Sequence, residues 1–382
     1  MDQNSDSLTE PLLPTSPVPA TPEPASEADE SDEMPPTVST KSSKRARIFR
    51  IAATFLVFVF IVVGLTQSLR TLLILDSDDL DIRTVLLRWG LPMTTYSHTI
   101  YPGDFTRDIQ PLPIHSHNDY WRRVPFYSAL AAGATSVEAD VWLFAEDGEL
   151  YVGHDKSSLS RNRTLGGLYI EPIVKLLAER NSVPQIGMKE KEQGMGGIRG
   201  IWDTQPSQTF HLYIDLKTQG EVTLPAVIRY LEPLRQWGYL TTWNGTNLIR
   251  GVVTVHLTGD TPFDLMLSSS GGSEGIRDYF YDSPVTELGT GKYNISNSLM
   301  ATANFKKEIG NVVWGSGGMS ESMKEKVKGH IKEAHERGIG IRYWDTPYWP
   351  VATRDQVWGQ LVACGVDLLN VDDLKGATSG KW

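Results

Sequence analysis

The chain has 382 residues, 40% of them hydrophobic and 9% aromatic, which is enough for one large barrel or two average domains. The formal net charge of −10 argues against a nucleic-acid partner, because the only basic cluster is short. A single cysteine, Cys364, excludes an intramolecular disulfide framework and a cysteine-based metal cage. A buried thiol is the expected state of Cys364.

Residues 1–47 are predicted to be a disordered tail. This segment is acidic, rich in Pro and Ser and nearly free of aromatic residues, and it ends in the basic cluster. Such a composition cannot bury enough apolar surface to offset the entropy lost on ordering.

Residues 48–70 are predicted to form a single transmembrane helix. The stretch "IAATFLVFVFIVVGLTQSL" is close to the roughly 20 residues that cross a hydrocarbon core. A cleaved signal sequence would start near Met1, and a core helix of a globular domain is rarely apolar on every face. Because basic residues precede the span and acidic residues follow it, the N-terminus is expected to be cytoplasmic and the rest luminal or extracellular. The sequence leaves open which membrane this is.

A linker or stem is expected over 71–110, before the folded domain. Three N-x-S/T sequons lie downstream of the span and are candidate glycosylation sites, in keeping with that orientation: Asn162, Asn244 and Asn294.

Residues 111–382 alternate short apolar strands with helical patterns, which is typical of an α/β protein with a parallel sheet. A TIM (β/α)₈ barrel fits this length, with seven or eight parallel strands. Strands are expected at 112–117, 135–144, 149–155, 209–217, 251–259, 310–316, 338–345 and 366–373. Helices are expected at 125–132, 170–180, 225–237, 322–337 and 353–364. Residues 260–297 are expected to be rich in loops, and the Gly-rich 185–208 to be a surface loop.

Polar residues collect where these strands end, which is the active-site face of such a barrel. Glu138 and Asp140 are two apart in one strand, so they project to the same side, and Asp215 ends the next parallel strand. Three carboxylates suit a hard divalent cation, Mg²⁺ or Ca²⁺.

Three further residues at the strand ends have predicted catalytic roles. Lys217 is placed to neutralise an anionic substrate oxygen, and His115 and His154 to act as general base and general acid. Taken singly, these residues could be solvated edge groups or surface ion pairs. Their order at successive strand ends favours one shared site. His117 is interpreted as fixing the loop, with a second catalytic role as the alternative.

The order "IHSHN", "VEADVWLFAEDGELYVGHD" and "YIDLK" resembles the phospholipase-C-like phosphodiesterase superfamily, which includes glycerophosphodiester phosphodiesterases and sphingomyelinase D. The start "HSHNDYW" and the long N-terminal extension are most similar to the fungal family called altered inheritance of mitochondria protein six. The resemblance implies a TIM barrel with a metal on Glu138, Asp140 and Asp215 and with acid–base catalysis by His115 and His154. It also implies that Trp344 and Asn370 shape the substrate mouth, and Asn118 is expected there too.

Two departures put a glycerophosphodiester substrate in doubt. The usual His-Arg-Gly start is replaced by His115-Ser-His117-Asn118, and Glu-x-Lys by Asp215-Leu-Lys217. There is also little room after His154 for a small insertion domain. The expected function is therefore that of a membrane-anchored, metal-dependent phosphodiesterase acting on a phospholipid or lysophospholipid, with oligomeric state left open.

Two rival functions stand beside this one. The pair His115 and His117 also resembles the start of amidohydrolase-type barrels, in which histidines hold a transition metal, and only His256 is placed to add another ligand. The second rival is a membrane-tethered binding barrel without turnover, against which the full set of ligands and histidines argues.

Overall fold

The computed structural model describes residues 41–77, 106–182, 197–271, 275–313 and 315–379. The predicted tail over 1–40 and most of the predicted linker, 78–105, lie outside these residues. Residues 183–196, which include the first half of the predicted Gly-rich loop, lie outside them as well.

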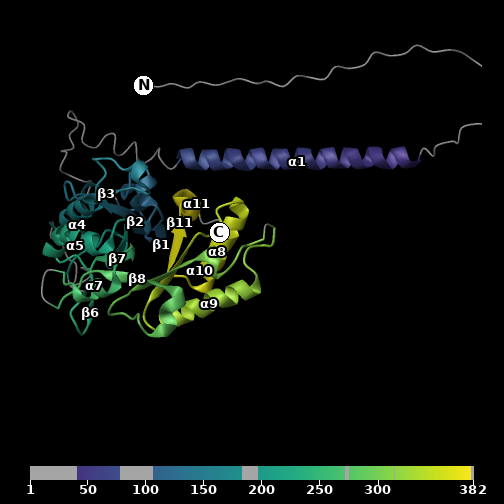
Figure 1. Ribbon diagram of the computed structural model, residues 1–382. Helices are drawn as coiled ribbons and strands as arrows, with labels where there is room; N and C mark the ends of the chain where they lie inside the picture. Colours follow the sequence, from purple (N-terminus) through teal and green to yellow (C-terminus); the bar gives the residue numbers. More distant parts are fainter. Residues whose placement is uncertain (1–40, 78–105, 183–196, 272–274, 314, 380–382) are drawn as a thin grey trace, which may run out of the picture. The chain divides into compact units, whose positions relative to one another are not determined.

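The apolar segment near the N-terminus is helical. Helix α1 (Lys41–Ser77), labelled in Figure 1, includes Arg47–Leu69, a stretch long and apolar enough to span a membrane. None of this stretch is buried within the protein. The helix also includes residues 41–47 of the predicted tail, because Lys and Arg have a high helix propensity.

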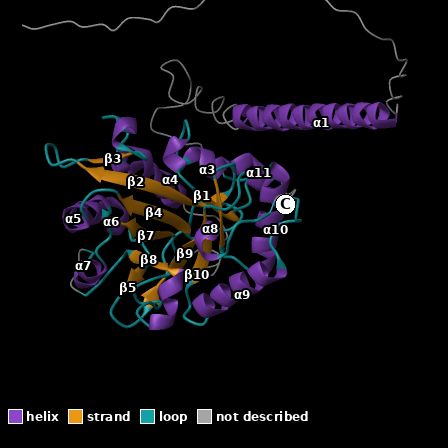
Figure 2. Cartoon of the chain, turned by 45° about the vertical axis from the view of Figure 1, so that its right-hand side comes forward, coloured by secondary structure: helices purple, strands orange, loops and turns teal. Residues whose placement is uncertain are grey.

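The remaining described residues form a closed parallel barrel surrounded by helices (Figure 2). The order β1-β11-β10-β9-β8-β7-β4-β2 is closed by pairing of β1 with β2, so eight parallel strands meet edge to edge, as predicted. The strands are β1 (Leu112–Ser116), β2 (Ala134–Leu143), β4 (Phe210–Leu216), β7 (Val253–Gly259), β8 (Phe280–Pro284), β9 (Met300–Asn304), β10 (Gly340–Trp344) and β11 (Leu368–Val371).

Helices follow most of the strands and cover the outside of the barrel. The α-helices are α3 (Tyr127–Ala131), α4 (Glu171–Ser182), α5 (Gly220–Tyr230), α6 (Glu232–Gln236), α7 (Phe263–Ser268), α8 (Phe305–Glu308), α9 (Glu321–His335), α10 (Val351–Cys364) and α11 (Leu374–Thr378). Short 3-10 turns are η1 (Asp119–Trp121), η2 (Lys156–Ser158) and η5 (Val285–Thr290), and η3 (Gly166–Ile170) is a π-turn leading into α4.

Two short additions decorate the barrel. Strand β3 (Leu150–Val152) returns antiparallel to the end of β2, which gives the hairpin predicted at the turn Glu146-Asp147-Gly148. The small ribbon of β5 (Thr242–Trp243) and β6 (Leu248–Ile249) precedes β7.

Two strands were not foreseen, and one predicted strand is wrong. Residues 310–313 form no strand, and Val313 is exposed. The strands of this region are β8 and β9, because barrel pairing selects "FYDSP" and "MATAN" over the more apolar run that follows them. Propensity is a weak guide where strands pair on both edges.

Alternation along each strand divides its side chains between the helices and the barrel interior. Val137, Ala139 and Val141 of β2 are buried in the large apolar core that includes residues of the surrounding helices. Glu138 and Asp140 therefore point inward. The middle of the interior is filled by aromatic and charged groups, with Tyr213 contacting both His115 and Arg342. The site described next lies above this layer, at the carboxyl ends of the strands.

Candidate active site

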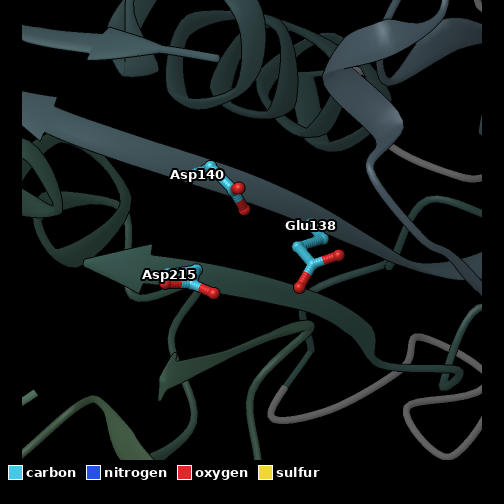
Figure 3. Close-up of side chains that lie close together, drawn as sticks. All are labelled: Glu138, Asp140 and Asp215. Atoms are coloured by element: carbon cyan, nitrogen blue, oxygen red, sulfur yellow. The ribbon is translucent and has the colours of Figure 1, made fainter. Parts of the chain in front are cut away.

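Three carboxylates converge at the mouth of the barrel. Glu138 and Asp140 come from β2 and Asp215 from β4, and the backbone register places Asp140 beside Asp215. One oxygen of each carboxylate lies within 4.8 Å of the others. Figure 3 shows the three side chains pointing into the space between the two strands. The predicted ligand set is thus brought together by the pairing of neighbouring strands.

Lys217 supplies one positive charge to this cluster. Its Nζ lies 2.8 Å from Asp215 Oδ2 and 3.0 Å from Asp140 Oδ2. Three ionised carboxylates and one ammonium leave two negative charges in a half-enclosed place. A divalent cation would balance these two negative charges, and hard divalent cations prefer oxygen ligands such as carboxylates.

The environment of the buried carboxylate oxygens is also consistent with a bound cation. Burial, followed by the charges of Glu138 and Asp215, raises the pKa of Asp140. Asp215 Oδ1 is buried and has no hydrogen-bond partner among the described residues. A bare carboxylate oxygen in such a place costs free energy unless a cation or water meets it.

A glycine keeps Asp215 in place. Gly259, at the end of β7, has a φ of +67°, and a Cβ there would lie 2.0 Å from Asp215 Oδ1. Only a residue without a side chain lets β7 pass so close to this carboxylate.

His115 lies below the cluster and is fully buried. Its Nδ1 is hydrogen-bonded to Ser136 Oγ at 2.7 Å, and its Nε2 is 3.8 Å from Glu138 Oε2. Burial, together with the charge of Arg342, lowers the pKa of His115 to about 3. The imidazole is closed off from the mouth, so its burial argues against the predicted role of general base.

His117 is open to the mouth where His115 is not. Its Nδ1 is 2.8 Å from Asp372 Oδ1, and its Nε2 is 3.7 Å from Glu138 Oε2. Burial works against protonation, but the hydrogen bond to Asp372 and the charge of Glu138 raise the pKa of His117 overall. A carboxylate that orients one imidazole nitrogen while the other faces the site is the arrangement of an acid–base histidine.

His154 faces the same carboxylates from another side. It follows β3, its side chain is 50% exposed, and its Nδ1 is 3.5 Å from Asp140 Oδ2. The Trp121 ring lies 5.1 Å from the imidazole ring. His154 therefore occupies the mouth, as predicted from the hairpin.

Tyr120 links His154 to the carboxylate cluster. Its hydroxyl is 2.8 Å from Asp140 Oδ2, which accepts its hydrogen bond, and 3.1 Å from His154 Nδ1. Asn118 Oδ1 is within hydrogen-bond reach of the same hydroxyl, and the Asn118 backbone N–H donates to Glu138 Oε2 at 3.0 Å. Asn118 adopts a left-handed conformation, φ 48°, that turns this N–H toward the carboxylate.

The two other residues predicted to bind substrate are placed differently from each other. Trp344 ends β10 and is exposed at the mouth. Asn370 is buried inside the barrel beside His115, and its Oδ1 accepts a hydrogen bond from Arg342 at 2.8 Å. Arg342 in turn pairs with the buried Asp282 at 3.0 Å. Asn370 thus belongs to the packed layer beneath the site.

The structure adds residues that sequence reasoning did not single out. Tyr120 and Arg342 have no role in the predicted site. Asp372 falls within the strand predicted over 366–373, with no role assigned to it. Tyr120 stands within the "HSHNDYW" stretch, so its position next to the histidines was the only available signal. The sequence around Arg342 contains no signal of its role, because its partner Asp282 lies 60 residues away in β8, a strand that was not predicted.

His256 does not complete a histidine-rich metal site. Its Nε2 is hydrogen-bonded to His211 Nδ1 at 2.9 Å, and its ring stacks on Tyr213 below the mouth. Among the described residues, the only group suited to a metal is the three carboxylates. This geometry disfavours the amidohydrolase-type rival.

The fold and the site together define a TIM barrel with a carboxylate cluster at its mouth, and comparison with known proteins places it among phosphodiesterase-type domains. Residues 103–282 match a family model described as the AIM6-like phosphodiesterase domain. This stretch holds all three carboxylates, Lys217, the two histidines of the mouth, His117 and His154, and the buried His115. No solved structure matches the chain.

Similar proteins cover the barrel beyond that stretch. The Altered inheritance of mitochondria protein 6 homolog of Arthroderma benhamiae is 40% identical over 287 residues, 72% of this chain and 86% of that protein. Altered inheritance of mitochondria protein 6 of Zygosaccharomyces rouxii is 35% identical, over 72% of this chain and 70% of its own length. That of Saccharomyces cerevisiae is 33% identical, with 72% of each chain covered. The chain belongs to the altered inheritance of mitochondria protein 6 family, which confirms the resemblance.

Proposed function

We propose that this protein is a divalent-metal-dependent phosphodiesterase that acts on a phospholipid or lysophospholipid. The observation that carries the proposal is the convergence of Glu138, Asp140 and Asp215 beside Lys217, with His117 and His154 on the same mouth. Carboxylates for a cation, a fixed ammonium and two imidazoles match the needs of a reaction at phosphorus.

Glu138, Asp140 and Asp215 would hold the cation, Mg²⁺ or Ca²⁺. When bound, the cation neutralises charge on the phosphoryl oxygens and makes the phosphorus more open to attack. Lys217 keeps two of the ligands together and offers its ammonium to a phosphoryl oxygen at the edge of the cluster.

The two mouth histidines share the proton transfers. Asp372 holds the His117 imidazole so that Nε2 faces the site, where it takes the proton from the attacking hydroxyl or water. His154 gives a proton to the leaving oxygen as the phosphodiester bond breaks. His115, fully buried, positions Glu138. Water or a neighbouring substrate hydroxyl can act as the nucleophile, giving hydrolysis or a cyclic phosphate.

The test is turnover of phosphodiesters and lysophospholipids by the full chain with Mg²⁺ or Ca²⁺. His117→Gln and His154→Gln should each lower kcat by roughly 10² to 10⁴, the usual contribution of general acid–base catalysis. Asp140→Asn should raise the metal concentration needed. His335→Gln is the matched control, because His335 ends α9 and its partner is Asp367, outside the site.

The outcomes separate the proposal from its rivals. A parent that turns over no phosphodiester at any metal concentration would favour the binding barrel. Activity that depends on bound zinc or iron and needs His115 as a ligand would favour the amidohydrolase-type site. Activity unchanged in His117→Gln would return the base role to His115.

The position in the cell belongs to the same proposal. The basic residues before α1 favour a cytoplasmic N-terminus with the barrel in a lumen or outside the cell. The three sequon asparagines, Asn162, Asn244 and Asn294, are exposed, as glycosylation requires. Oligomeric state plays no part in the proposal.

A further inference from the structure

Exposed aromatic side chains gather at the active-site end of the barrel. Of the five Trp, Tyr and Phe side chains of the described barrel that are exposed, four lie at or just after the carboxyl ends of β1 and β10. These four are Trp121, Trp344, Tyr348 and Trp349, here called the rim aromatics. The fifth, Trp237, follows α6 and precedes β7, at the opposite end of the barrel.

The rim aromatics lie close to the site. Trp121 belongs to η1, directly after His117 and Asn118, and its ring contacts that of His154. Trp344 follows Arg342 on the inward-facing side of β10, and Tyr348 and Trp349 continue in the loop before α10. In the barrel, β11 alone separates β1 from β10, and Arg122 Nη2 donates to the Asp372 carbonyl in the loop after β11. The rim aromatics therefore lie at the same end of the barrel as the carboxylate cluster.

Large aromatic rings left in water at one end of a protein have a physical cost, which a partner surface would remove. Trp and Tyr are the residues that favour the head-group region of a bilayer, because their rings are apolar while their N–H or O–H groups remain hydrated. The same chain holds a segment, Arg47–Leu69, long and apolar enough to span a membrane. A lipid surface is therefore the partner that the chain itself brings within reach.

We propose that the rim aromatics insert into the head-group region of a bilayer and seat the mouth over it, so that the substrate is a lipid still resident in the membrane. The lipid phosphodiester then rises between the rings toward the carboxylate cluster without leaving the bilayer completely. This inference deepens the proposed function and rests on it for the identity of the substrate, but the docking itself does not depend on turnover.

The test uses the full chain reconstituted in phosphatidylcholine vesicles, with Cys364→Ser as the background so that one cysteine can be spin-labelled. Tyr348→Cys reports on the rim, Trp237→Cys is a matched control of similar exposure (77% and 58%), and Phe58→Cys in α1 is a reference. Docking predicts that the label at 348 is reached by lipid-dissolved oxygen and shielded from a water-soluble nickel chelate. The label at 237 should behave as in water.

Three results would be informative. Equal access of the nickel chelate to labels at 348 and 237 would overturn the proposal. Shielding of the label at 348 from both reagents would also overturn it, in favour of contact between protein surfaces. Shielding from the chelate together with free access of oxygen would support it.

A second measurement links docking to substrate choice. The double variant Tyr348→Ser with Trp349→Ser should lose roughly 10-fold in turnover of vesicle-embedded phospholipid, since two apolar contacts with the bilayer are removed. Turnover of a water-soluble phosphodiester, bis(p-nitrophenyl) phosphate, should stay unchanged. Equal loss on both substrates would refute the docking role. A parent inactive on both would count against the proposed function, while the spin-label result would still decide the docking.

Discussion

Tyr120 offers the sharpest single test of the proposed site, because its hydroxyl contacts a proposed metal ligand, Asp140, and a proposed catalytic histidine, His154. The side chain is buried, and its hydroxyl donates to Asp140 Oδ2 at 2.8 Å with His154 Nδ1 3.1 Å away. Tyr120→Phe removes the hydroxyl donor and keeps the aromatic ring in place.

The magnitude follows from the bond that is lost. A hydrogen bond to a charged group contributes about 1.5–3 kcal/mol. In the variant, Asp140 Oδ2 would still have Lys217 Nζ as a partner at 3.0 Å, so the free-energy cost should lie in the lower part of this range. About 1.4 kcal/mol corresponds to a factor of 10, so the lower half of the range, about 1.5–2.2 kcal/mol, predicts that kcat/KM falls roughly 10- to 40-fold. Loss of a group that orients a metal ligand has an effect of the same order on metal affinity.

The assay is steady-state turnover against metal concentration, with thermal unfolding measured in parallel. Tyr239→Phe is the matched control: Tyr239 is equally buried, and within the described chain its hydroxyl has no hydrogen-bond partner. It should change turnover less than twofold, a bound that follows from the small effect of deleting an unpaired hydroxyl. Equal activity of Tyr120→Phe and the parent at limiting metal would refute the role given to Tyr120.

Four further predictions follow from the same geometry. Lys217→Met should reduce turnover by roughly 10² or more while leaving divalent-metal affinity intact or higher, because the site becomes more negative; metal titration followed by calorimetry separates the two effects. Gly259→Ala should weaken metal binding, because a Cβ would displace Asp215; unchanged affinity would contradict the tight approach of β7. Burial, with the charge of Arg250 in second place, lowers the pKa of His211 from 6.5 to about 4, so the unfolded chain takes up a proton more readily than the folded one. The contribution of neutral His211 to the free energy of unfolding should be fully present above pH 6.5, and up to about 3 kcal/mol of it should be lost as the pH drops toward 4. In urea titrations at several pH values, His211→Gln should show a smaller loss of stability over this range. Endoglycosidase treatment of the full chain from fungal microsomes should shift its mass, and the shift should shrink step by step as the sequon asparagines are replaced by Gln; an unmodified chain would speak against a luminal barrel.

Local sequence patterns are enough to predict the type of fold and the candidate metal-ligand set. Alternation of short apolar strands with helical segments requires a parallel sheet whose carboxyl ends meet on one face. A spacing of two in a strand requires Glu138 and Asp140 to share a side. The apolar run of α1 is likewise a property of composition alone. These features depend on local periodicity, which can be read without knowledge of distant contacts.

Long-range packing selects which histidine opens onto the mouth and which strands complete the barrel. His115 and His117 share one face of the same strand end, yet one is buried under Glu138 and the other is held open by Asp372, 255 residues away. Strands β8 and β9 are only five residues long each, lack a run of β-branched residues, and form because their neighbours need partners on both edges. Depth within the barrel and pairing across the chain are long-range properties, so local sequence patterns do not encode them.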